Sequence, residues 1–176
     1  MNQKLYFILL FIFSLSAFSQ ELMQIKNSKS YPATSTWDFI SENYALTGIT
    51  TIQIAKTEKG GVLKIAIETT DATFAISGIV YVYLTDNTII TCSDKSSRET
   101  IGNQIISYYS FSPIEMNKLK ATTIESIHFN IKGNPKGFSS QIGNFTALNK
   151  KKYFSTAFDK TNKRFDTAHE IKSLYK

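Results

Sequence analysis

The chain has 176 residues with a formal net charge of +6, and 42% of its residues are hydrophobic. It holds one cysteine and two histidines, and only two of its 20 cationic residues are arginines. This composition argues against a disulfide framework, against a zinc cluster of cysteine and histidine, and against sequence-specific nucleic-acid recognition, for which arginine is the preferred cation.

Residues 1–19 have the pattern of a secretory signal. Lys4 gives a positive start, an unbroken apolar run of nine residues follows, and Ala17 and Ser19 place small residues before a cleavage point. The run is short for a membrane span, and an uncleaved anchor is the alternative. We therefore expect an exported protein, periplasmic or extracellular, with no transmembrane anchor after cleavage.

Residues 20–35 are polar and are expected to form a leader into a single β-rich domain of residues 36–176. Near the start of this domain, Trp37 and Phe39 are two positions apart and would share one face of a first strand. A short helix opened by a capping box at 35–38 is the alternative.

Two hairpins follow in the pattern of the next residues. Alternating apolar positions over 48–56 and 62–68 flank a turn that contains two glycines. The second hairpin pairs the strand 78–84 with the short run 89–91 across a polar turn. Large apolar or aromatic groups lie on both faces of the strand 78–84, which predicts that it lies in the middle of the sheet.

Beyond residue 92 the chain alternates polar loops with regular elements. A polar loop over 93–103 precedes a strand over 104–111. Ser112, Pro113 and Glu115 then have the spacing of a capped helix start. A strand over 124–132 follows.

The C-terminal segment 132–176 is basic and aromatic. It holds ten lysines and arginines against three acids, and its phenylalanines are too numerous to remain in water. We expect it to pack on the domain and to end in a helix that begins at Asp166. The predicted fold is therefore mainly β: an antiparallel, sandwich-like domain with one short inserted helix and a C-terminal helix. An α+β protein with a single antiparallel sheet is the alternative.

Few residues are suited to catalysis. Cys92 ends a β run without an activating helix behind it, so a structural thiol is favoured over a nucleophile served by His128. His128 is placed on the polar face of its strand and His169 on the surface of the last helix. No metal-ligand spacing and no cofactor motif is present.

Acid pairs are the remaining catalytic candidates. Glu68 with Asp71, and Asp94 with Glu99, lie on or beside loops where two carboxylates could converge for glycoside cleavage. Fourteen acids produce such neighbours by chance, which is the simpler interpretation.

Two groups of residues are candidates for binding. Tyr81, Tyr83 and Tyr109 could form an aromatic platform across two strands, as in proteins that bind carbohydrates or peptides, unless the C-terminal phenylalanines cover that face. Lys150, Lys151 and Lys152 could form a patch for an anionic envelope polymer or another protein; separate solubilising charges are the alternative. The sequence thus favours a non-enzymatic binding or interaction module, with a polymer hydrolase as the alternative, and it predicts no cofactor and no metal.

Overall fold

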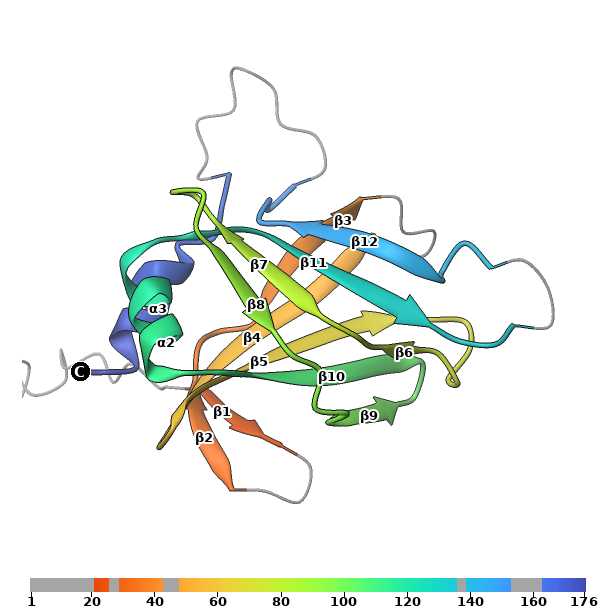
Figure 1. The fold of residues 1–176 in the computed structure, drawn as a ribbon, viewed down its shortest axis with the longest axis horizontal. Helices are drawn as coiled ribbons and strands as arrows, with labels where there is room; N and C mark the ends of the chain where they lie inside the picture. Colours follow the sequence, from red (N-terminus) through yellow and green to blue (C-terminus); the bar gives the residue numbers. More distant parts are fainter. Residues whose placement is uncertain (1–20, 26–28, 43–47, 136–138, 153–162) are drawn as a thin grey trace, which may run out of the picture.

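The chain folds mainly into antiparallel strands, as the computed structural model shows for residues 21–25, 29–42, 48–135, 139–152 and 163–176 (Figure 1). The predicted signal segment lies outside these residues. The strands are β1 (Glu21–Gln24), β2 (Ser30–Ala33), β3 (Trp37–Glu42), β4 (Ile49–Thr57), β5 (Gly60–Glu68), β6 (Ala75–Ile76), β7 (Val80–Leu84), β8 (Ile89–Cys92), β9 (Arg98–Ile101), β10 (Gln104–Phe111), β11 (Ile124–Lys132) and β12 (Gly143–Leu148). The helices are α2 (Pro113–Ala121) and α3 (Thr167–Ser173). Neither of them is long enough to cross a membrane.

All these strands belong to one curled sheet. Its main path runs β8-β7-β11-β12-β3-β4-β5-β10-β9, while β1 and β2 join it at β4 and β6 joins it at β11. The sheet forms a half-barrel, with β9 and β10 at one end of the path and β7 and β8 at the other (Figure 1). The expected mainly antiparallel β class is confirmed, with its strands in a single curled sheet.

The two predicted hairpins are confirmed. β4 and β5 pair in unbroken register from Thr57 opposite Gly60 to Thr50 opposite Ile67. β7 and β8 pair across a tight turn in which Asn87 has a positive φ of 65°, a conformation that asparagine tolerates better than most residues.

The concave side of the sheet holds the main core. Trp37 and Phe39 of β3 are both fully buried there, and their rings stack with centroids 6.5 Å apart. Val80 and Val82 of β7 are also fully buried, so the predicted alternation along this strand is confirmed. The strand is, however, next to the end of the sheet, not in its middle.

The β1–β2 hairpin is packed against the rest of the domain, where the sequence indicated a polar leader. Met23 of β1 is buried in a second apolar cluster with Ala33, Ala55, Ala66 and Tyr108. Three of these residues are alanines, whose small side chains let the hairpin approach the sheet closely. A short polar sequence can therefore be held by very few buried residues.

Both helices lie at one end of the half-barrel (Figure 1). Ser112 and Glu115 form the predicted capping box at the start of α2: the Glu115 N–H donates to the Ser112 hydroxyl over 3.3 Å, and the Ser112 N–H donates to the Glu115 carboxylate over 2.6 Å. Met116 and Leu119 of α2 and Ile171 of α3 reach the main core. The helices thus close this end of the core.

Besides β1, β2 and the two-residue β6, the sequence patterns missed β9 and β12, whose sequences lack a clear period of two. β9 lies within the predicted polar loop, and β12 lies in the C-terminal segment, where aromatic residues are irregularly spaced. β12 is held on both sides, by β11 and by β3, so tertiary pairing overrides its weak local pattern.

No backbone pairing joins the two ends of the described sheet, and we call the gap between them the seam. Side chains connect the two ends across it. The backbone oxygen of Ile76 accepts hydrogen bonds from Arg98 Nε over 2.8 Å and from Ser107 Oγ over 2.9 Å. Asp94 forms an ion pair with Arg98 and accepts the Gly78 N–H over 2.7 Å. We call Asp94, Arg98 and Ser107 the seam cluster. It connects β9 and β10 to the chain that leads from β6 into β7.

A side chain at Gly60 would collide with the backbone. The φ of this glycine is +134°, and a Cβ there would lie 2.1 Å from the backbone oxygen of Phe111. We expect Gly60→Ala to lower the free energy of unfolding by about 3 kcal/mol, measured by urea denaturation. Gly102→Ala is the control, because its φ of +58° is left-handed but its surroundings are open, so a loss of only about 1 kcal/mol is expected. Equal losses of unfolding free energy at both positions would contradict a steric clash with the backbone oxygen of Phe111.

The seam cluster should make stability depend on pH. Burial alone would raise the pKa of Asp94, but the N–H groups of Gly78 and Ser96 and the charge of Arg98 together hold it below the usual value. The carboxylate therefore stabilises the fold fully above the ordinary aspartate pKa of about 4, and this contribution is lost as the pH falls through the lower folded-state value.

Asp94→Asn should accordingly cost about 1–2 kcal/mol near neutral pH, through its weakened hydrogen bonds to Gly78 and Arg98. The difference from the wild type should shrink in strong acid. Thermal unfolding at neutral and acidic pH measures both effects. Glu58→Gln is the control, because its ion pair with Lys29 is about four-fifths exposed and contributes little. A deficit for Asp94→Asn that is the same at both pH values would contradict the role of the charge.

Candidate functional site

Tyr81 and Tyr83 lie on the outer face of β7, away from the core. The side chain of Tyr81 is 39% exposed and that of Tyr83 is half-buried. They are two positions apart on one strand and therefore lie about 7 Å apart along it. The described part of the C-terminal segment does not bury Tyr81, since Phe165 instead stacks on Phe39 with ring centroids 6.0 Å apart.

His128 of β11 extends the aromatic surface. It lies opposite Tyr81 in the strand register, and its ring contacts the ring of Tyr83 with centroids 4.4 Å apart. Burial lowers the pKa of His128, and the negative charge of Glu42 opposes this only in part. The imidazole is therefore uncharged at neutral pH and forms a flat extension of the tyrosine surface.

Apolar side chains surround these rings. Ile89 of β8 lies opposite Tyr83 and is 49% exposed, and Ile79, the residue before β7, is 50% exposed. We call Ile79, Tyr81, Tyr83, Ile89 and His128 the outer aromatic face. Clustered exposed apolar groups with polar tips are typical of binding surfaces.

Tyr109 does not belong to this face. It is only 2% exposed and lies in the main core, where its hydroxyl donates to the backbone oxygen of Gly78 over 3.4 Å. Its neighbour Tyr108 is on the opposite side of β10 and donates its hydroxyl to Glu99. The sequence could not place Tyr109, because β10 and β7 lie far apart along the path of the sheet.

Lys150, Lys151 and Lys152 are all exposed, directly after β12. The Lys151 N–H donates to the backbone oxygen of Lys163 over 3.0 Å, which brings this run beside Lys163 and Arg164. We call these five residues the basic cluster: Lys150, Lys151, Lys152, Lys163 and Arg164. Nearby carboxylates are Glu125, which pairs with Arg164 over 3.5 Å, and Asp166.

Asn149 fixes the position of the basic cluster. Its side-chain amide donates to the backbone oxygens of Ile124 over 2.8 Å and Phe165 over 3.0 Å, and its side-chain oxygen accepts the Phe165 N–H over 2.8 Å. The Thr167 hydroxyl accepts the Ile124 N–H over 2.9 Å. One buried asparagine therefore joins the ends of β11 and β12 to the segment before α3.

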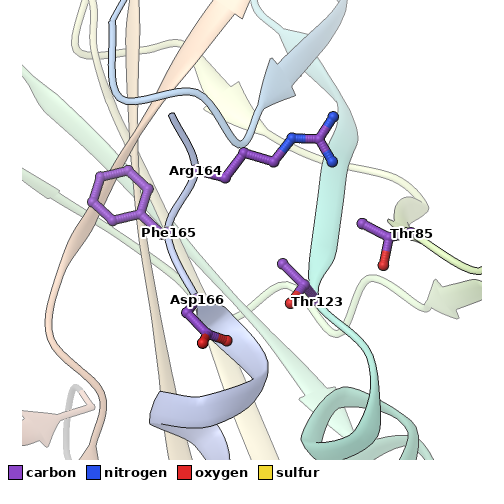
Figure 2. Close-up of a pocket in the computed structure, with 5 residues that line it drawn as sticks. All are labelled: Thr85, Thr123, Arg164, Phe165 and Asp166. Atoms are coloured by element: carbon purple, nitrogen blue, oxygen red, sulfur yellow. The ribbon is translucent and has the colours of Figure 1, made fainter. Parts of the chain in front are cut away.

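A cavity of about 340 Å³ opens beside this junction (Figure 2). Figure 2 shows the Arg164 guanidinium on the side where the hydroxyls of Thr85 and Thr123 lie, with the Phe165 ring on the other side of the segment. Asp166 completes the lining and also caps α3 by accepting the His169 N–H over 3.1 Å. Sequence patterns could not indicate this cavity, since its lining comes from three segments far apart in the chain.

A bulge in β11 directs an acid toward the cavity. The β7–β11 register shifts between Ile124 and Ser126, so Glu125 has no residue opposite it on β7. Bulges redirect side chains, and here Glu125 forms the ion pair with Arg164 at the edge of the lining.

The acids proposed for catalysis serve other contacts. Asp94 belongs to the seam cluster, and Glu99 accepts the Tyr108 hydroxyl. Asp71 accepts the hydroxyl and N–H of Thr73, and these bonds lower its pKa. Neither these acids nor Glu68 lines the cavity shown in Figure 2.

His169 is exposed on α3, as expected. Within the described residues, no group of three or more histidine, cysteine, aspartate or glutamate side chains is arranged to hold a metal ion.

No protein-family model matches the chain, and no curated protein or solved structure is significantly similar to it.

Cys92 is buried at 1% exposure at the end of β8, which favours a structural role. Burial raises the pKa of its thiol to about 12, and the charge of Glu115 adds to the shift. We expect alkylation by iodoacetamide near pH 8 to be at least about a hundredfold slower than that of free cysteine, because little thiolate forms. The urea-unfolded protein, which exposes the thiol, is the control. Fast labelling of the folded protein would contradict this assignment.

Proposed function

We propose that the chain is an exported, non-enzymatic binding module that binds a polymer on the outer aromatic face and the basic cluster. The exposure of Tyr81 beside the stacked pair of Tyr83 and His128 is the observation that carries this proposal. A flat aromatic surface with polar hydroxyl tips suits ligands with both apolar and polar groups, as sugars and peptides have. The signal-like pattern of residues 1–19 supports export.

The basic cluster supports an anionic partner. Five cations lie on two adjacent backbone runs, joined by the hydrogen bond between Lys151 and Lys163. Four of them are lysines, which act as point charges without a fixed hydrogen-bonding geometry. Such a cluster attracts anionic polymers of the cell envelope through their summed charge, without requiring one sequence or structure.

The rigidity of the sheet also supports binding. The outer aromatic face lies on paired strands whose opposite side is packed in the main core, since Val80, Val82 and Ile127 are fully buried. A surface held in this way changes little on binding, so little conformational entropy is lost. The alternative, a polymer hydrolase, gains no specific support from the positions of the acids described above.

Tyr81→Ala tests this proposal by removing an exposed ring from the centre of the outer aromatic face. We expect binding to an insoluble envelope polysaccharide preparation to weaken by about tenfold, as loss of a stacking contact of roughly 1–1.5 kcal/mol would cause. A pull-down titration measures it, and the melting temperature should change little because the residue is exposed.

Tyr175→Ala is the matched control, because Tyr175 is 37% exposed and lies beyond α3, away from the outer aromatic face. It should bind like the wild type. If Tyr81→Ala binds as tightly as Tyr175→Ala, the outer aromatic face is not the binding surface.

A further inference from the structure

We infer that the ligand is an acidic polysaccharide, which places a carboxylate at Arg164 in the cavity and its sugar rings on the outer aromatic face. This inference rests on the proposed function and gives it a substrate class. Its basis is that the cavity, the basic cluster and the outer aromatic face are adjacent in space.

The connection runs along β7. Thr85 follows Tyr83 by two residues, and its N–H donates to the backbone oxygen of Thr123 over 3.0 Å, so the pairing with β11 continues past the bulge. Tyr81 and Tyr83 share one face of β7, and Thr85 begins the turn directly after this strand, two residues beyond Tyr83. The tyrosines therefore end within two residues of the lining of the cavity.

The cavity contains the groups that an acidic sugar needs. Arg164 offers a planar guanidinium that can bind a carboxylate through two parallel hydrogen bonds. The hydroxyls of Thr85 and Thr123 can donate to or accept from sugar hydroxyls. Lys151 adds positive charge near this segment, since its ammonium group lies 5.2 Å from the centre of the Phe165 ring.

The ion pair between Arg164 and Glu125 would compete only weakly with a ligand. The N–O distance of this pair is 3.5 Å, and both side chains are about half exposed, so water screens the attraction. A ligand carboxylate in the cavity could make two parallel hydrogen bonds to the guanidinium and so compete with Glu125 for it. The remaining cations of the basic cluster would then attract the next acidic units of the same chain.

The ligand class follows from this combination. A neutral sugar chain would contact the tyrosines of β7 but not bind the basic cluster. A lipid headgroup would bind the basic cluster but not contact the tyrosines of β7. A polymer that alternates carboxylates with sugar rings uses both.

Polygalacturonate, and the same polymer after reduction of its carboxyl groups to alcohols, provide the test. Affinity electrophoresis in gels that contain either polymer measures binding of the full-length protein. We expect the acidic form to bind at least about tenfold more tightly than the reduced form and to lose this advantage as salt is added, because charge attraction is screened. Equal binding of both forms would overturn the inference.

Arg164→Gln should weaken binding of polygalacturonate by about tenfold, the usual cost of losing a charged hydrogen-bonding partner, and Arg164→Lys should recover part of it. Lys95→Gln removes the same charge from an exposed position in the loop after β8, beyond the opposite end of the β7–β8 hairpin from Thr85, and should bind like the wild type. Unchanged melting temperatures would show that all three variants fold. An effect of Lys95→Gln as large as that of Arg164→Gln would overturn the assignment of the site.

The failure of this inference can be distinguished from that of the proposed function. If Tyr83→Ala weakens binding to both polymers while Arg164→Gln weakens neither, the binding module stands and its ligand is neutral. Binding to phosphatidylcholine vesicles that contain phosphatidylglycerol, without binding to polygalacturonate, would identify a lipid headgroup and also overturn the inference.

Discussion

The hydrogen bonds that the seam cluster makes to a two-residue strand hold the curled sheet in its shape. A half-barrel that is not closed by a backbone ladder needs another connection between its ends, and here the backbone oxygen of Ile76 accepts from both Arg98 and Ser107. Asp94 neutralises Arg98 and accepts the Gly78 N–H at the start of β7. Because these polar groups satisfy one another, they can sit at a partly buried seam without a large desolvation cost.

This closure determines which side of the sheet remains exposed. Large apolar side chains fill the concave side, with Trp37, Phe39 and Tyr109 among them, and the two helices cover one end. The convex side is only partly covered, by the β1–β2 hairpin over β4, β5 and β10. The strands β7, β8 and β11 therefore keep an exposed outer face, and Asn149 positions the basic cluster at the end of the same strands.

Local patterns predicted those parts of the fold whose causes are local. Alternation identified the inward residues of β7, turn chemistry identified both hairpins, and the spacing of Ser112 and Glu115 identified the start of α2. The sequence could not show which strands become neighbours, so Tyr109 was grouped with Tyr81 although the two lie on opposite sides of the sheet. The cavity was invisible for the same reason, because hydrogen bonds between distant segments assemble it. A basic run at 150–152 could be seen, but its proximity to Arg164 depends on one backbone contact.

The two strands that flank the seam also affect how separate copies of the protein can associate. β8 and β9, the strands at the two ends of the sheet, have only four residues each. Among the described strands, each pairs on one side only, so each leaves a row of backbone groups that another chain could use to add a strand. Their shortness, and the charges of Arg98 and Glu99 on β9, leave little edge on which such an addition could begin. Such short end strands beside the seam are poor templates for aggregation.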